Sequence, residues 1–467
     1  MVRPLKILLA ASETVGFAKT GGLADVAGSL PRALTRRGHT CAVILPLYHC
    51  ARTGLLPVAP TEHRLLIPVG DRLCEGRLWR GTLPDSEVPV YLIDHPEFFD
   101  RDDRSLGLGL YQFTASDGHK RDYPDNCARF VFFCRAVLES LRLLDFWPDV
   151  LHANDWQAGL VPVYLEEIYR RHLDLALREK YRNIHTLFTI HNILYQGRFL
   201  AGDMALTGLD WRLFNYLQLE SYDRLNFLKG GIVFANLIST VSPTYAREIQ
   251  TPYFGEGLHG ALSERRDRLF GIVNGVDYTR WNPATDPHLP AHYHLDAITP
   301  GKELCKAELQ RRCGLPVDER APLLGIVARL VEQKGIGLLT QAAPAFLQWG
   351  CQLVVLGDGD PYWHRLLEDL RDRYRRRMCL TLGFDEPLAH LIEAGADMFL
   401  MPSLFEPSGL NQLYSMRYGT VPVVRATGGL ADTILDSTPA TLAAGTATGF
   451  RFDPPWPGAF RDTVGRA

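Results

Sequence analysis

The chain has 467 residues, of which 46% are hydrophobic and 22% are charged, with a formal net charge of −3. This length exceeds what one ordinary core serves, so two domains are expected, and the composition is that of a globular protein. The charge balance gives no reason to expect nucleic acid or an anionic membrane as a partner. The nine cysteines form no C-x-x-C pair, which argues against a zinc site and a disulfide framework and favours a cytoplasmic location.

The first elements follow the order of a doubly wound α/β domain. The patterns predict a buried strand at Ile7–Ala11, a glycine loop at Lys19–Gly22, a helix over Leu23–Leu34 and a strand at Val43–Pro46. Glycine lets the backbone approach a ligand closely, and the positive charge of Lys19 suits an anion. An ordinary strand-to-helix turn explains the loop equally well. The G-x-G-x-x-G pattern of nicotinamide sites is absent.

Two later strands end in polar side chains. Asp149–Trp156 carries His152 and Asn154, and Thr186–Asn192 carries His191. A histidine that closes a buried strand is often purely structural, but two strands that end alike favour one shared cleft. Between these regions and the first strands, residues 60–100 are predicted to add strands, residues 101–125 to form a surface loop, and residues 129–144 to form an amphipathic helix.

A segment rich in Pro, Asn and Asp, Trp281–Pro287, suggests a domain boundary. We therefore assign residues 1–272 to an N-terminal domain, 273–284 to a linker and 285–467 to a C-terminal domain. Strands of the second domain are predicted at Leu323–Val327, Leu353–Gly357, Cys379–Gly383 and Met398–Met401. Two cations, Arg329 and Lys334, follow the first of these strands and suit a diphosphate, although surface charge alone is the simpler interpretation.

The stretch Ala396–Gly419 predicts a buried strand, a Pro/Ser/Gly turn and a helix. Glu406 lies at the carboxyl end of the strand, where open α/β sheets place their ligand groups. Backbone amides near Ser408, Gly409 and Leu410 would face a phosphate or a sugar hydroxyl. An ordinary crossover with an exposed glutamate is the alternative.

One six-residue sequence occurs twice. Thr20–Asp25 recurs letter for letter as Thr427–Asp432, and each copy follows an apolar segment and opens a predicted helix. Two similar α/β domains, each with a glycine turn directed to a common cleft, would explain the repetition. Chance identity among Gly, Ala and Leu is the weaker explanation.

These motifs together resemble those of bacterial glycogen synthases and plant starch synthases, the fifth glycosyltransferase family. The matching segments run in order along most of the chain: Lys19–Asp25, His152–Trp156, Thr189–Asn192, Phe227–Ile232, Val273–Asp277, Arg329–Gly335 and Glu406–Leu410. The resemblance implies a GT-B architecture, in which two Rossmann-like doubly wound domains face each other across a cleft. It also implies transfer of glucose from ADP-glucose to the non-reducing end of an α-1,4-glucan such as glycogen or starch, with retained anomeric configuration and no metal or other cofactor.

The resemblance also implies roles for individual residues. Arg329 and Lys334 match the pair that holds the diphosphate, Glu406 the carboxylate beside the donor sugar, and His152 the strand-end histidine against that sugar. These four are the predicted catalytic residues. The predicted donor-binding residues are Lys19, Gly22, Asn274, Phe384, Ser408, Gly409, Leu410, Tyr414, Thr427 and Gly428, with Phe384 stacked on the adenine. Weaker candidates for the acceptor side are Asp25, Asp125, Asn154 and His191.

The chain departs from the family pattern at several places. Gly337 stands where Asp is common, and Ser408 replaces a common Cys, which removes a thiol but keeps the turn. Residues 453–458 are predicted to be non-helical because of their Pro and Gly content. Relative to the family, the chain is expected to be a fragment that lacks a C-terminal return helix.

Two other functions stay open at this point. A GT-B transferase that uses UDP-glucose would share the scaffold, and so would a catalytically silent glucan-binding protein. The retained Lys19, Arg329, Lys334 and Glu406 argue against the silent protein, because binding alone does not need phosphate-directed cations. The sequence leaves the oligomeric state open.

Overall fold

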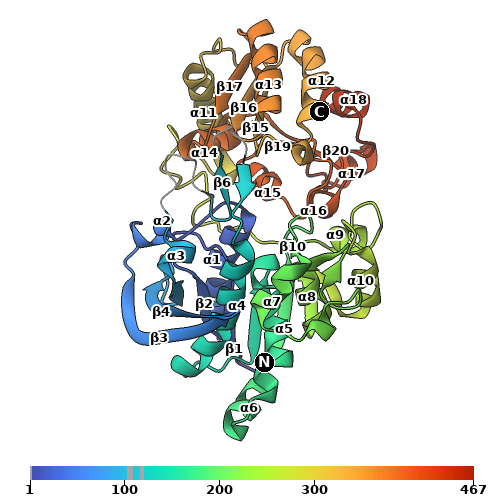
Figure 1. Cartoon of the computed structure of the whole chain (residues 1–467). Coiled ribbons are helices and arrows are strands. Elements are labelled where there is room, and N and C mark those ends of the chain that lie inside the picture. The colour runs from blue at the N-terminus through green and yellow to red at the C-terminus, as the bar shows by residue number, and fades with distance from the viewer. Residues whose placement is uncertain (1–2, 102–108, 116–119) are drawn as a thin grey trace. The chain divides into compact units, whose positions relative to one another are not determined.

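The computed structural model describes residues 3–101, 109–115 and 120–467, which form two compact units (Figure 1). The first unit comprises the residues up to Val241 together with Ala246–Ile272. The second comprises Ser242–Tyr245 and Val273–Ala467. The division between Ile272 and Val273 gives each unit its own sheet. The assignment of residues 273–284 as a linker stays a prediction.

The first unit is built on a nine-stranded sheet in the order β14-β13-β9-β8-β1-β2-β5-β4-β3. All neighbours in it pair in parallel except β3 with β4 and β4 with β5. These strands are β1 (Lys6–Ala10), β2 (Thr40–Pro46), β3 (Ala59–Val69), β4 (Arg72–Thr82), β5 (Pro89–Asp94), β8 (Val150–Asn154), β9 (His185–Ile190), β13 (Leu237–Thr240) and β14 (Leu269–Gly271).

Helices flank this sheet, and further short strands form small separate sheets (Figure 1). The helices before Ile272 are α1 (Gly22–Arg36), α2 (His49–Arg52), α3 (Pro96–Phe99), α4 (Asn126–Leu143), α5 (Leu160–Glu167), α6 (Leu175–Arg182), α7 (Met204–Thr207), α8 (Phe227–Phe234), α9 (Pro243–Glu248) and α10 (His259–Glu264). The short strands are β6 (Gln112–Thr114), β7 (Lys120–Asp122), β10 (Arg198–Leu200), β11 (Glu220–Ser221) and β12 (Arg224–Asn226).

The predicted surface loop at residues 101–125 is only partly described. Residues 102–108 and 116–119 lie outside the described residues. The rest of the segment contains the antiparallel pair β6 and β7, which the prediction of a surface loop did not include. The strands are too short, at three residues each, to leave an alternating pattern in the sequence.

The second unit has a six-stranded parallel sheet in the order β17-β16-β15-β18-β19-β20. Its strands read as apolar runs because helices cover both faces of such a sheet. They are β15 (Leu323–Val327), β16 (Gln352–Gly357), β17 (Met378–Leu382), β18 (Met398–Met401), β19 (Val421–Arg425) and β20 (Phe450–Phe452). The helices are α11 (Ile298–Arg312), α12 (Ile336–Gln348), α13 (Pro361–Arg373), α14 (Glu386–Gly395), α15 (Asn411–Arg417), α16 (Gly428–Thr433), α17 (Pro439–Ala443) and α18 (Pro457–Arg466).

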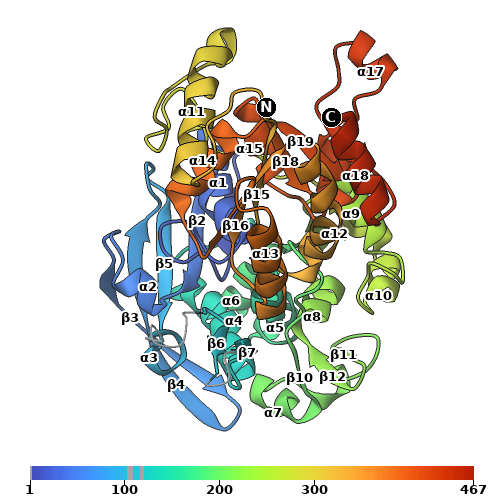
Figure 2. The same ribbon diagram turned by 90° about the horizontal axis from the view of Figure 1, so that it is seen from above.

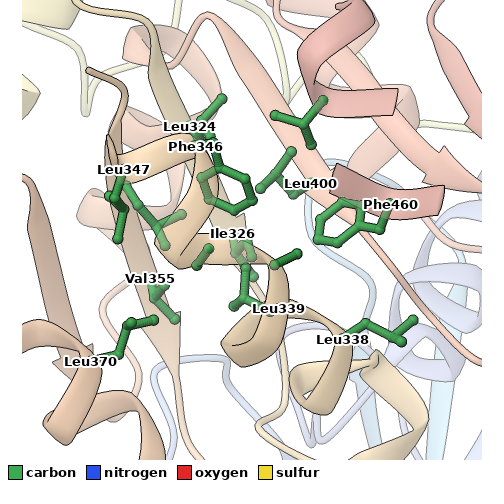
Figure 3. Close-up of a cluster of buried hydrophobic side chains, with 14 of the residues drawn as sticks. Leu324, Ile326, Leu338, Leu339, Phe346, Leu347, Val355, Leu370, Leu400 and Phe460 are labelled. Carbon is green, nitrogen blue, oxygen red and sulfur yellow. The ribbon is translucent and has the colours of Figure 1, made fainter. Parts of the chain in front are cut away.

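The last helix corrects the expectation for residues 457 and 458, whereas residues 453–456 are non-helical as expected. Helix α18 begins at Pro457, which is tolerated there because the first turn needs no amide donor from that residue. It lies alongside α12 (Figure 2). Phe460 meets Phe346 edge-on, with ring centroids 6.3 Å apart, in the core that also holds Leu339 and Leu400 (Figure 3). Burial of the Phe460 ring against α12 stabilises α18, although this helix begins with Pro-Gly.

The duplicated sequence opens a helix in each unit, as predicted. The first copy leads into α1 and the second into α16, and the residue before each helix, Gly21 or Thr427, has an extended backbone. Each copy follows a parallel strand of its own sheet. In both Rossmann-like units, the repeated sequence therefore follows a strand and begins a helix.

Candidate active site

The turns that follow β15 and β18 are joined to each other in the second unit. The amide of Leu404 donates to the carbonyl of Gln333 at 2.8 Å, and the side-chain amide of Gln333 donates to the carbonyl of Phe405 at 3.3 Å. Arg329 lies on the exposed side of the first turn, where its guanidinium is 3.5 Å from Oε1 of Gln333. Neighbouring parallel strands thus bring both turns to one edge of the sheet.

Gly335 makes this close approach possible. Its φ is +69°, and a Cβ at this position would lie 1.9 Å from the carbonyl oxygen of Pro402. Any other residue would push the two turns apart and would also be strained in the left-handed region. The glycine directly follows Lys334, so it determines how closely Lys334 approaches the turn after β18.

Lys334 and Glu406 form an ion pair across these turns. Nζ of Lys334 lies 2.5 Å from Oε2 of Glu406, and their side chains are 20% and 7% exposed. The hydroxyl of Ser403 donates to the same carboxylate oxygen at 3.0 Å. A charge-assisted bond at this burial fixes both side chains. The glutamate is therefore held in place by a cation and a hydroxyl, and the exposed-glutamate alternative is wrong.

The second glycine turn packs on the backbone of Glu406. The amide of Gly429 donates to the carbonyl of Glu406 at 3.1 Å. Gly428 has a φ of +45°, and a Cβ on it would lie 1.9 Å from that same carbonyl oxygen. Thr427 and Gly428, predicted to bind the donor, thus lie against the turn that carries Glu406 and the buried Ser408.

The other predicted donor residues of this unit are more dispersed. Gly409 and Leu410 directly precede α15, which begins at Asn411. The ring of Tyr414 stacks on Trp281 at 3.8 Å between centroids, so it contacts protein rather than open surface. Phe384 is 87% exposed just after β17, and Asn274 lies in the irregular segment after β14.

In the first unit, the polar ends of β8 and β9 lie side by side. Nε2 of His152 lies 2.6 Å from Oγ of Thr189, and Nε2 of His191 lies 2.9 Å from Oδ1 of Asn154. Burial lowers the pKa of His152 to about 4 and that of His191 to about 3. Both imidazoles are therefore neutral at pH 7 and act through hydrogen bonds rather than charge.

Asp155 is a candidate site residue that was not predicted from the sequence. Its φ is +55°, unusual for a residue other than glycine, and it accepts a hydrogen bond from the amide of His191 at 2.7 Å. Burial raises the pKa of Asp155 to about 7, against the lowering effect of the amides of His191 and Asn192. Strain and a displaced pKa together mark functional sites, and neither is visible in the sequence.

Glu13 is a second residue that sequence reasoning missed. Its carboxylate, only 4% exposed, accepts hydrogen bonds from the amide and hydroxyl of Thr20 at 2.5 and 2.7 Å and from the amide of Gly21 at 3.2 Å. The hydroxyl of Tyr111 adds a fourth at 2.8 Å. Glu13 thereby holds the loop that leads into Gly22, the first residue of α1. An acidic residue just after an apolar strand was the only sequence signal.

Three predicted site residues of this unit, Lys19, Asp25 and Asp125, take part in ion pairs. Nζ of Lys19 lies 2.7 Å from Oδ1 of Asp25, and Lys19 remains half exposed. Asp125 pairs with Arg101, whose Nη1 lies 3.0 Å from Oδ1. Exposed pairs of this kind contribute little stability, so a ligand can displace the partner of Lys19 at low cost.

Within the described ranges, no group of three or more His, Cys, Asp or Glu side chains could hold a metal ion. Over the same part of the chain, no helix is both long and apolar enough to cross a membrane.

Comparisons with known proteins identify the family of the chain. A family model described as the starch synthase catalytic domain matches residues 6–264, and one described as glycosyl transferases group 1 matches residues 321–462. Glycogen synthase 1 of Geobacter metallireducens is 43% identical over 469 residues, which cover 100% of this chain and 89% of the relative. Glycogen synthase of Thioalkalivibrio sulfidiphilus is 47% identical over 470 residues, which cover 99% and 92%.

A solved structure of the catalytic domain of starch synthase IV from Arabidopsis thaliana, bound to ADP and acarbose, matches with a TM-score of 0.87. It is 35% identical and is matched over 99% of this chain and 91% of its own. The fold is that of a GT-B glycosyltransferase with two Rossmann-like domains. Within that class, the chain belongs to the starch and glycogen synthase family, and it is a glycosyltransferase that uses a nucleotide-sugar donor and a glucan acceptor.

Proposed function

We propose that the chain transfers glucose from ADP-glucose to the non-reducing end of an α-1,4-glucan, with retention of the anomeric configuration. The observation that carries this proposal is the partly buried Lys334–Glu406 ion pair near Arg329, at the carboxyl ends of β15 and β18. Cleavage of a sugar–diphosphate bond leaves negative charge on the diphosphate and positive charge on the sugar. A cation pair next to a carboxylate complements both charges.

Each side chain has a defined task in this proposal. Arg329 and Lys334 hold the diphosphate and stabilise the charge that grows as the glycosidic bond breaks. Glu406 accepts hydrogen bonds from ring hydroxyls and favours oxocarbenium character. The ion pair places Lys334 before the donor arrives, so little reorganisation is needed during the reaction.

We further propose that the first unit contributes hydrogen bonds rather than charge to the sugar. His152, neutral at pH 7, donates to or accepts from a sugar hydroxyl. Lys19 and the amide of Gly22 serve the donor phosphates. The acceptor-side candidates remain Asp25, Asp125, Asn154 and His191.

We also propose that no metal ion takes part, because Arg329, Lys334 and Lys19 supply the positive charge that a diphosphate needs. Transfer should then proceed at the same rate in a chelator such as EDTA. A rate that falls in EDTA and returns with added Mg²⁺ would contradict this proposal.

Incubation with radiolabelled ADP-glucose and glycogen, with UDP-glucose in parallel, tests the proposed function. Label in precipitated glucan from ADP-glucose, well above that from UDP-glucose, is the expected result. Greater incorporation from UDP-glucose would favour that donor instead. No label from either donor, with retention of the chain on glycogen, would favour a glucan-binding protein without activity.

Phe384 is expected to contribute to donor affinity by stacking on the adenine. The ring is 87% exposed, so a planar base can cover it without displacing protein contacts. Phe384→Ala should raise the Michaelis constant for ADP-glucose by about 5–10-fold, which corresponds to a stacking energy of about 1–1.5 kcal/mol, and should change turnover much less. Trp456→Ala, at a 59% exposed aromatic of the same unit, is the control. An unchanged Michaelis constant would place the adenine elsewhere.

Glu13 is expected to act on the donor through the loop that it holds. In Glu13→Gln a side-chain NH₂ replaces one carboxylate oxygen and opposes the donors of Thr20 and Gly21 or of Tyr111. Loss of such bonds costs about 1–2 kcal/mol, so the Michaelis constant for ADP-glucose should rise about 5–30-fold. Steady-state kinetics give this Michaelis constant for Glu13→Gln and for the control Glu62→Gln. The side chain of Glu62 is 87% exposed. Equal constants in both variants would show that the loop keeps its conformation without Glu13.

A further inference from the structure

Two cysteines of the second unit lie in contact although they are far apart in the sequence. Cys313 caps the end of α11, and Cys379 lies in the edge strand β17. Each thiol shifts the pKa of the other, which places the two side chains next to each other. Both are half-buried and pack against the same hydrophobic core cluster. No sequence motif marks this pair, because only the fold brings the two positions together.

The two thiols also line one surface pocket. Its volume is about 450 Å³, and Arg371 and Arg375 lie in its wall together with Asp372, Met378 and Leu380. Asp372 pairs with both arginines, at 3.1 and 3.5 Å, so the pocket keeps a net positive charge. These arginines belong to the arginine-rich segment 371–377, which the proposed transfer reaction does not use.

The environment makes the two thiols unequal. The neighbouring Cys313 lowers the pKa of Cys379 to about 7, helped by Thr381 and the charge of Arg371 and opposed by burial. The proximity of Cys379 and burial raise the pKa of Cys313. Cys379 is therefore the attacking thiolate, and Cys313 is the thiol held beside it.

We propose that Cys313 and Cys379 form a dithiol site that exchanges with low-molecular-weight, anionic disulfides and closes to an intramolecular disulfide. The thiolate of Cys379 attacks one sulfur of the disulfide, forms a mixed disulfide and releases one thiolate. Cys313 then loses its proton, attacks Sγ of Cys379 and expels the second thiolate. Two protein thiols are oxidised and one external disulfide is reduced to two thiols. The carboxylates of glutathione suit Arg371 and Arg375.

Mass spectrometry of the whole chain tests this site directly. The reduced chain is incubated with oxidised glutathione at pH 7, alkylated and digested. The expected product is a pair of peptides linked by a disulfide between Cys313 and Cys379. Its mass is that of the two reduced peptides minus two hydrogens, and dithiothreitol should convert it back to the two reduced peptides. In Cys313→Ser the reaction should stop at Cys379 with one glutathione attached, and in Cys379→Ser neither product should form.

Cys50 provides the matched control. It is an exposed residue, but desolvation raises the pKa of its thiol, so it should react about 5–10-fold more slowly than Cys379. Cys50→Ser should give the same linked peptide as the unmodified chain. A chain that gains glutathione on Cys50 while Cys313 and Cys379 stay reduced would overturn the proposal. So would attachment at Cys379 that never resolves to the linked pair.

Discussion

Replacement of Lys334 or Arg329 by alanine is expected to lower glucosyl transfer by about 10²–10³-fold in turnover, the usual loss for one transition-state donor. The reason is geometric: Lys334 lies 2.5 Å from Glu406, in a turn fixed against the turn after β18. In the proposed function, this charge faces the diphosphate as it separates from the sugar. Initial rates with saturating ADP-glucose and glycogen give the turnover number for each variant.

Lys306→Ala is a matched control for the loss of a lysine ion pair. Nζ of Lys306 lies 2.7 Å from Asp397, the residue before the amino end of β18. This pair lies at the opposite end of the strand from Glu406. Its loss should leave turnover within about 2-fold, because an ion pair with one exposed partner contributes little. If Lys306→Ala and Lys334→Ala lose turnover equally, the effect of Lys334→Ala comes from lower protein stability and not from a role at the diphosphate.

Glu406→Gln is expected to lower turnover by about 10²–10³-fold while donor affinity changes less than about 3-fold. The substitution keeps the size of the side chain and removes the charge that faces Lys334 and the hydroxyl of Ser403. If the carboxylate favours a sugar with cationic character, the loss falls on the transition state. Turnover and the dissociation constant for ADP-glucose, measured separately, distinguish the two.

Glu393→Gln controls for a buried carboxyl group in the same unit. Burial raises the pKa of Glu393 to about 8, and the hydroxyl of Ser415 donates to it at 2.6 Å. It is largely protonated at pH 7, so the substitution changes little charge and should leave turnover nearly intact. An equal loss of turnover and affinity in Glu406→Gln would mean that Glu406 only holds a ground-state hydroxyl.

The main elements of both sheets were predictable because parallel strands leave apolar runs that end in glycine or polar residues. The strands at Leu323–Val327 and Met398–Met401 match β15 and β18, and the duplicated sequence opens a helix in each unit. The local pattern also located the turns that carry Arg329, Lys334 and Glu406, whereas the roles predicted for these residues came from the family resemblance. These signals are local, so a single sequence can show them.

Contacts between distant segments could not be predicted in the same way. The four hydrogen bonds to Glu13, the strained backbone of Asp155 and the contact between Cys313 and Cys379 all depend on tertiary structure. Helix α18 was missed because its Pro-Gly start outweighed the packing of Phe460. Tertiary burial can override local propensity in this way.

The central claim is tested most directly by proton NMR of ADP-glucose mixed with a short α-1,4-glucan and the enzyme. We expect the anomeric signal of ADP-glucose to be replaced by that of a new α-1,4-linked glucose, while an equal amount of ADP appears. Free glucose, a β-linked product or an unchanged donor signal would contradict the account.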